Sequence, residues 1–140
     1  MNYWVFKCDR AKYRLDDRLI DPAEPITWRV TRYSDEIKPG DLAFISQIGS
    51  DRGIRAVMEI KSVPDVMPEI PSEIKYWLGD GQPIVECRVK GKLTHRCNVI
   101  SFKTLKTIHG LEALCIYSAE RQTNFRLTKA QGEILMGLIA

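Results

Sequence analysis

The residues best suited to chemistry are two arginines and two aromatic residues within one short segment. This segment reads Trp28-Arg29-Val30-Thr31-Arg32-Tyr33 and lies next to an expected turn. A nucleobase presents a flat π face on which tryptophan and tyrosine stack, with a gain of roughly 1–3 kcal/mol per base. Arginine can hold the flanking phosphate, and threonine can satisfy a base edge. The pattern is compatible with a nucleic-acid contact, but taken alone it favours a core position for Trp28 beside solvated arginines, because buried aromatic residues are common and base cages are rare.

A second segment of the same character, Thr123-Asn124-Phe125, has Arg121 and Arg126 beside it. Threonine and asparagine side chains can hydrogen-bond the edge of a base, or they can close a turn. Trp77 is likewise open to two interpretations, as a core residue of a short helix or as a lid over a pocket. The two aromatic segments and Trp77 are therefore the elements that the fold must bring together if they form one site.

Groups able to move protons are few. The two histidines, His95 and His109, have no candidate nucleophile or carboxylate nearby in the sequence that would orient them for acid–base work. The chain is therefore predicted not to be an enzyme. In the alternative, a subunit or accessory domain of an RNA- or nucleoside-modifying enzyme, the proton-transferring group would be Asp41, Cys8 or His109.

Metal binding is not predicted either. The four cysteines contain no C-x-x-C pair, and His95 near Cys97 lacks a second ligand pair at metal spacing. We expect four reduced thiols, with no structural metal and no cofactor. The cysteines are Cys8, Cys87, Cys97 and Cys115.

The length of 140 residues and the hydrophobic fraction of 44% are those of a single domain, predicted to span residues 1–140. A formal charge of +3 shifts the expectation only slightly toward a polyanionic partner. The N-terminus lacks the pattern of a signal peptide, and no apolar run approaches the roughly 18 residues of a membrane span. The protein is predicted to be cytoplasmic and to have no membrane partner.

Apolar residues recur mostly with the period of strands, and turn signals separate them. Odd-numbered residues around Val85, Cys87 and Val89 are expected to face inward, with the even-numbered set outward. Gly49–Gly53 has the length and the glycines of a hairpin connection. The predicted strands are Tyr3–Lys7, Ile26–Thr31, Leu42–Ile48, Ile54–Ser62 and Pro83–Leu93.

Short helices are predicted around these strands. Ser101 is a plausible N-cap, and Thr128 with Gln131 fits a capping box before a final helix that runs to the C-terminus. Leu111–Ala119 is compatible with a helix or a strand, and Pro64–Pro71 is expected to be irregular. The other short helical segments are Cys8–Glu24 (a loop or a short helix), Ser72–Leu78 and Ser101–Ile108. Several short strands with few helices favour a small curled sheet or barrel.

Five segments also occur in a recognisable order that covers essentially the whole chain. They are Tyr3–Lys7, Ile26–Tyr33, Ile37–Asp41, Arg52–Ile54 and Thr123–Thr128. In this order and spacing the chain resembles an EVE domain, a member of the PUA-like superfamily related to the YTH and ASCH domains. The resemblance implies an α+β fold, a PUA-like pseudo-β-barrel of about five to six strands flanked by short helices.

The resemblance also implies a function. Family members are non-enzymatic modules that bind DNA or RNA and read a modified base, typically a methylated one, flipped into an aromatic pocket. Trp28 would stack on the base, and the backbones of Lys7 and Cys8 would form one wall. The other implied contacts are Arg29, Thr31, Arg32 and Tyr33 at the mouth, Thr123 and Asn124 at the base edge, and Trp77 and Phe125 as lid or wall.

Two positions depart from the family pattern. Ser46 stands where relatives often carry an aromatic residue, which would leave the aromatic cage one ring short. Arg121-Gln122 stands where a Gln-Gly pair is usual, which alters how closely the backbone approaches a base. A nuclease or restriction component is a further partner suggested by the roles of relatives. A pure interaction domain would instead use the regions of Met58, Met67 and Met136.

Overall fold

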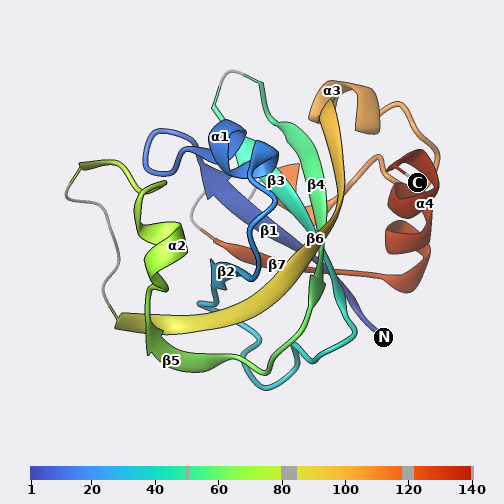
Figure 1. Cartoon of the computed structure of the whole chain (residues 1–140). Coiled ribbons are helices and arrows are strands. Elements are labelled where there is room, and N and C mark those ends of the chain that lie inside the picture. Colours follow the sequence, from blue (N-terminus) through green and yellow to red (C-terminus); the bar gives the residue numbers. More distant parts are fainter. Residues whose placement is uncertain (50, 80–84, 118–121, 140) are drawn as a thin grey trace.

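One curled sheet runs through the molecule in the computed structural model, which describes residues 1–49, 51–79, 85–117 and 122–139 (Figure 1). Its strand order is β2-β6-β4-β3-β1-β7, and β5 pairs with β6 to complete seven strands. The predicted α+β, barrel-like fold is confirmed, with one strand more than the expected five to six. The strands are β1 (Tyr3–Asp9), β2 (Ile26–Arg29), β3 (Leu42–Ile48), β4 (Gly53–Ile60), β5 (Asp65–Pro68), β6 (Val85–Ser101) and β7 (Asn124–Leu127).

Strand β1 lies between β3 and the terminal strand β7 of the sheet and separates two hydrophobic cores. It runs parallel to β3 and antiparallel to β7. Because side chains alternate along a strand, Trp4, Phe6 and Cys8 enter the first core, whereas Tyr3 and Val5 enter the second. Burial on both faces explains the nearly continuous apolar character of this strand.

The helices cover the two faces of the sheet. Helices α1 (Leu15–Ile20) and α2 (Pro71–Ile74) lie on the side of the first core, and α4 (Lys129–Ile139) lies against the second core (Figure 1). Helix α3 (Phe102–Leu105) also contributes to the second core. Among the described residues, no helix is both long and apolar enough to cross a membrane.

Two predicted helix caps are confirmed. The Ser101 hydroxyl accepts a hydrogen bond from the Thr104 amide at the start of α3. In the capping box before α4, the Thr128 hydroxyl accepts from the Gln131 amide at 3.1 Å, and the Gln131 side chain accepts from the Thr128 amide at 3.0 Å. The undecided segment after residue 111 contains a 3-10 helix, η2 (Cys115–Tyr117), while residues 118 and 119 lie outside the described residues.

The prediction for β6 is wrong in two respects. The strand continues to Ser101 rather than ending at Leu93, because it pairs with β2, β4 and β5 along its length. The alternation also fails in its first half: Val85 is 58% exposed, and Arg88, expected outside, is fully buried. A buried carboxylate, described below, makes that burial possible. Residues 83 and 84 of the predicted strand lie outside the described residues.

Strand β5 was not expected, since Pro64–Pro71 was predicted to be irregular. Proline is compatible with this position because β5 pairs with β6 along one side only. The Met58 side chain, one of the proposed protein contacts, is fully buried in the first core. It is therefore unavailable to a partner protein.

Candidate functional site

A cavity of about 330 Å³ opens at the carboxyl ends of β1 and β3, on the side of the first core. We call it the Trp28 cavity. Its volume is at the lower end of the roughly 300–1,000 Å³ typical of small-ligand sites, which suits a single base or nucleoside. The fold brings six of the predicted site residues into its lining: Lys7, Cys8, Trp28, Arg29, Trp77 and Thr123.

Three aromatic side chains from separate segments form the walls of the Trp28 cavity. The ring of Tyr13, in the turn after β1, meets the ring of Trp28 edge-on at 5.9 Å between centroids. It also meets Trp77, in the turn after α2, in a T-shaped contact at 5.0 Å. Trp77 is half-buried and is therefore the most accessible of the three rings. The arrangement offers flat apolar surface to a planar aromatic ligand.

The buried carboxylate of Glu69 connects these walls to one another. Its Oε1 accepts hydrogen bonds from the Thr27 hydroxyl at 2.6 Å and from the Ile70 amide at 3.0 Å. Its Oε2 accepts from the Trp77 indole N–H at 2.8 Å and from the Arg88 guanidinium at 3.1 Å. Trp77 is thus fixed as a wall of the cavity, and Arg88 is held in the lining with its charge neutralised.

A second buried carboxylate, Glu73, fixes Tyr13. The Tyr13 hydroxyl donates to Glu73 Oε1 at 2.9 Å, and Arg18 forms a 2.6 Å ion pair with Glu73 Oε2. Burial raises the pKa of the Tyr13 phenol, and the neighbouring Glu73 carboxylate raises it further. The phenol therefore remains a hydrogen-bond donor at neutral pH. Backbone pairing between Tyr13 and Trp77 locks these two rings together.

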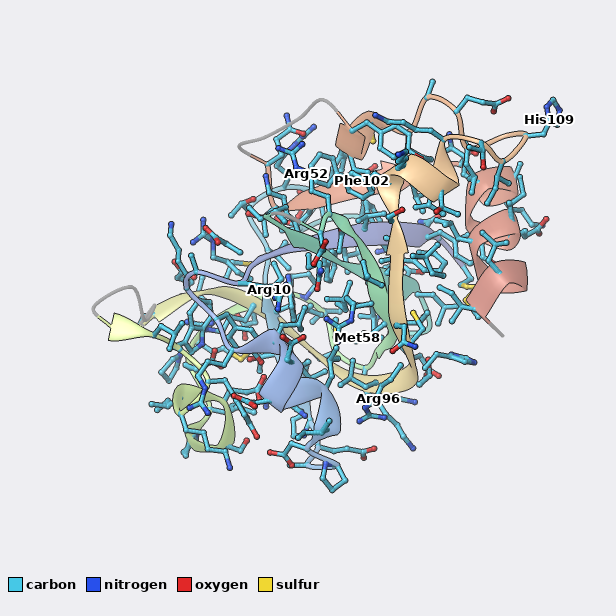
Figure 2. The ribbon with its side chains drawn as sticks, turned by 90° about the horizontal axis from the view of Figure 1, so that it is seen from above. Arg10, Arg52, Met58, Arg96, Phe102 and His109 are labelled. Carbon is cyan, nitrogen blue, oxygen red and sulfur yellow. The ribbon has the colours of Figure 1, made fainter. Side chains whose placement is uncertain are left out.

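The three candidate proton-transferring groups are not brought together. Burial raises the pKa of Cys8 to about 12, so its thiol stays protonated and unreactive. The Asp41 carboxylate accepts hydrogen bonds from the Trp4 indole and from two backbone amides. His109 is fully exposed beside Glu112 and projects from the edge of the molecule (Figure 2). Of the three, only Cys8 lines the Trp28 cavity.

Asn124 joins β7 to the end of β2. Its side-chain oxygen accepts hydrogen bonds from the Thr31 amide at 2.8 Å and the Thr31 hydroxyl at 3.3 Å. Its amide group donates to the Arg29 carbonyl at 3.1 Å. Asn124 is fully buried, and neither it nor Thr31 lines the Trp28 cavity. These bonds position the segment that carries Arg29, and direct contact of Asn124 or Thr31 with a base stays a prediction.

Arg32 and Tyr33 lie away from the Trp28 cavity. The Tyr33 ring packs on Trp4 with centroids 5.2 Å apart, and the Arg32 guanidinium lies 4.8 Å above the Tyr33 ring. Tyr33 adopts a φ of 64°, a left-handed conformation that turns the chain away after β2. Neither residue lines the Trp28 cavity, and contact of either with a ligand at its mouth stays a prediction.

Phe125 and Ser46 face a different cavity, of about 290 Å³, on the side of the second core. We call it the Phe102 cavity; Phe102, Tyr117 and Phe125 form part of its lining. Ser46 pairs with Lys7, and by alternation both side chains lie on the Val5 face of the sheet. The serine therefore does not shorten the aromatic set around Trp28. Arg121 lies outside the described residues.

Sequence reasoning missed Tyr13, Thr27 and Arg88 as lining residues, and Glu69 as the group that connects them. Tyr13 lies in a segment dense in charge, where its one aromatic ring between Lys12 and Arg14 was the available signal. For Arg88 and Glu69 there was no local signal, because an ion pair between positions nineteen residues apart is visible only once β5 and β6 pair. Within the described residues, no cluster of three or more His, Cys, Asp or Glu side chains is placed to hold a metal ion.

We compared the chain with models of known protein families. Residues 2–138 match the family model described as EVE domain. The chain belongs to the EVE domain family. None of the curated protein sequences searched matches this EVE domain.

Solved structures share the fold at low sequence identity. A hypothetical protein from Leishmania major is 14% identical, with a TM-score of 0.71 over 99% of this EVE domain and 94% of that chain. Human THYN1, solved in complex with DNA containing 5-methylcytosine, is 16% identical, with a TM-score of 0.68 over 99% and 97%. The YTH domain-containing protein mmi1, solved with RNA, is 13% identical, with a TM-score of 0.58 over 99% and 80%.

Proposed function

We propose that this EVE domain binds nucleic acid without catalysing a reaction on it, and that it holds one modified base in the Trp28 cavity. The observation that carries the proposal is the convergence of Tyr13, Trp28 and Trp77 around a cavity of about 330 Å³. Two proteins of similar fold were solved with nucleic acid, one with DNA containing 5-methylcytosine and one with RNA. A methylated cytosine is therefore the first candidate ligand.

The energetics of a flipped base fit this cavity. Extruding a base from its stack costs a few kcal/mol, and stacking on an aromatic side chain returns roughly 1–3 kcal/mol per base. Trp28 would offer its face, while the fixed ring of Trp77 would close the opposite side. A methyl group gains further from apolar walls, at about 0.8 kcal/mol per buried carbon. The walls are held by buried hydrogen bonds before the ligand arrives, so little ordering is required on binding.

The lining carries exposed cations together with one half-buried carboxylate, Asp9. Lys12 and Arg29 are exposed members of the cavity lining, at a position suited to phosphates flanking an inserted base. Arg29 lies 3.5 Å from Glu86, a half-exposed pair that a phosphate can displace at small cost. Binding should therefore weaken as salt rises.

A binding panel at fixed low salt tests this proposal. Fluorescence anisotropy would compare single- and double-stranded DNA and RNA carrying cytosine, 5-methylcytosine, 5-hydroxymethylcytosine or N6-methyladenine. Wild-type protein should prefer one modified base. The Trp28→Leu variant keeps apolar bulk but lacks the large π face, so that affinity should fall roughly 5- to 100-fold, in line with the loss of one stacking contact.

The matched control is Phe44→Leu, which replaces an equally buried aromatic ring in the second core, outside both cavities. It should retain the preference for the modified base. Equal weak binding to every oligonucleotide, unchanged by Trp28→Leu, would show that the cavity holds no base.

A further inference from the structure

We infer that the Phe102 cavity is a second nucleotide site, which receives a neighbouring base of the same strand that inserts a base into the Trp28 cavity. The inference rests on the proposed function and extends it. The two cavities open on opposite faces of the sheet at the same end of β1 and β3, and both are lined by Lys7 and Ile48. A strand that crosses this edge meets both openings.

The Phe102 cavity has the walls that a base requires. Phe102 and Tyr117 meet in a T-shaped contact at 5.1 Å, and Phe125 closes another side. The Lys106 ammonium lies 4.9 Å from the centroid of the Tyr117 ring, which keeps a cation beside this wall. Its volume of about 290 Å³ is close to that of the Trp28 cavity.

A buried hydroxyl lies in the lining. Ser46, which is 2% exposed, places its hydroxyl in the lining of the Phe102 cavity. A hydroxyl both donates and accepts hydrogen bonds, so at this position it can meet either kind of polar group on a base. The β3–β4 register shifts between Ile45 and Ser46, and such bulges are common beside functional sites because they redirect side chains.

The charge of the lining favours a nucleotide over an apolar ligand. Lys7 and the exposed Arg52 supply two cations, and no carboxylate occurs among the lining residues of the described chain. Figure 2 shows Arg52 beside Phe102, whereas Arg96 on β6 lies on the opposite part of the molecule. A nucleotide matches this lining, because its neutral aromatic base can pack against the aromatic walls while its phosphate pairs with Arg52.

Adjacent residues of β1 serve the two sites. Cys8 belongs to the first core and lines the Trp28 cavity, while the Lys7 side chain lies on the Val5 face. One phosphodiester backbone lying across this residue pair can therefore send successive bases to either side. The predicted consequence is that a trinucleotide binds more tightly than its central mononucleotide through contacts that lie outside the Trp28 cavity.

The experiment compares 5-methyl-dCMP with a single-stranded trinucleotide that carries 5-methylcytosine at its centre, using calorimetric titration. Ser46→Leu fills the Phe102 cavity, and Arg52→Gln removes its exposed cation. Both should weaken trinucleotide binding about 5- to 10-fold without changing mononucleotide binding, because neither residue lines the Trp28 cavity. Arg96→Gln, the matched loss of an exposed arginine, should change neither. Thermal melting checks that each variant is folded.

Several outcomes would overturn the inference. One is an unchanged trinucleotide affinity in both variants, and another is an equal loss in Arg96→Gln. A loss in Arg52→Gln alone, with Ser46→Leu folded and unaffected, would reduce the site to a surface phosphate contact. If wild-type protein binds modified and unmodified trinucleotides equally, base reading fails, but Ser46→Leu and Arg52→Gln still decide the second site on the unmodified strand. Failure to bind any trinucleotide would refute both.

Discussion

Replacing Glu69 by glutamine tests whether the negative charge of this side chain, rather than its size, holds the walls of the Trp28 cavity in place. The substitution keeps the size of the side chain but turns one of two acceptor oxygens into a donor. Four donors meet this carboxylate: the Thr27 hydroxyl, the Ile70 amide, the Trp77 indole and the Arg88 guanidinium. In either orientation of the glutamine amide, one pair of donors loses its acceptor.

The magnitude follows from burial. Arg88 is 1% exposed and Glu69 3% exposed at their side chains, so Glu69→Gln leaves a buried cation without its main counter-charge. Breaking a buried pair in this way costs about 3–5 kcal/mol. Against a total stability of about 5–15 kcal/mol, this is a large loss. The Trp77 indole would also lose its tether, so binding of a modified base should weaken at least tenfold.

Urea denaturation followed by circular dichroism would measure the change in unfolding free energy. Glu86→Gln is the matched control, because Glu86 also lies near Arg88, at 4.0 Å, but is 29% exposed. It should cost under about 1 kcal/mol. A second variant, Glu69→Gln combined with Arg88→Met, should recover much of the loss, because it removes the buried cation along with the carboxylate. If Glu69→Gln proves as mild as Glu86→Gln, the carboxylate does not hold the cavity together.

Two further predictions concern the scaffold. A Cβ at Gly132 would lie 2.1 Å from Tyr3 Cγ, so Gly132→Ala should destabilise the protein by about 1–3 kcal/mol. In the control Gly137→Ala, the new Cβ has no atom of the described chain within 4 Å, so this variant should stabilise the protein by up to about 1 kcal/mol. Chemical denaturation of both variants measures the two changes, and the opposite order would contradict the prediction. Burial raises the pKa of Cys8 from 9.0 to about 12, so the folded state keeps a proton that the unfolded chain has lost. This stabilisation, up to about 4 kcal/mol, is complete below pH 9 and disappears as pH rises toward 12. Denaturation at several pH values should give a shallower alkaline decline for Cys8→Ala than for Cys115→Ala, and identical declines would argue against the assignment.

Local patterns were sufficient to predict most strands and both helix caps. Leu42–Ile48 was predicted with its observed limits, because apolar residues and flanking turn signals define it within the segment itself. The capping box at Thr128 and Gln131 is likewise a local arrangement of hydrogen bonds. Where neighbours in sequence determine the conformation, sequence reasoning succeeded.

Long-range contacts explain what was missed. Strand β5 contains two residues of low strand propensity, Asp65 and Pro68, and exists because β6 offers it a partner. Arg88 is buried only because Glu69 reaches it from a neighbouring segment. For the site, Trp28 and Trp77 could be proposed from residue type, but their connection through Tyr13 and Glu69 depends on tertiary packing.

The pairing of β7 with β1 determines when the Trp28 cavity can form during synthesis of the chain. The Trp28 cavity uses residues from Lys7 to Thr123, and the Lys7 amide donates to the Thr123 carbonyl across that span. During synthesis, the cavity therefore cannot form until nearly the whole chain has left the ribosome. Until then the free edge of β1, an apolar strand, lacks the partner that covers it in the folded protein. Such non-local closure is typical of slower folding, so the emerging chain is most exposed to aggregation before its last strand arrives.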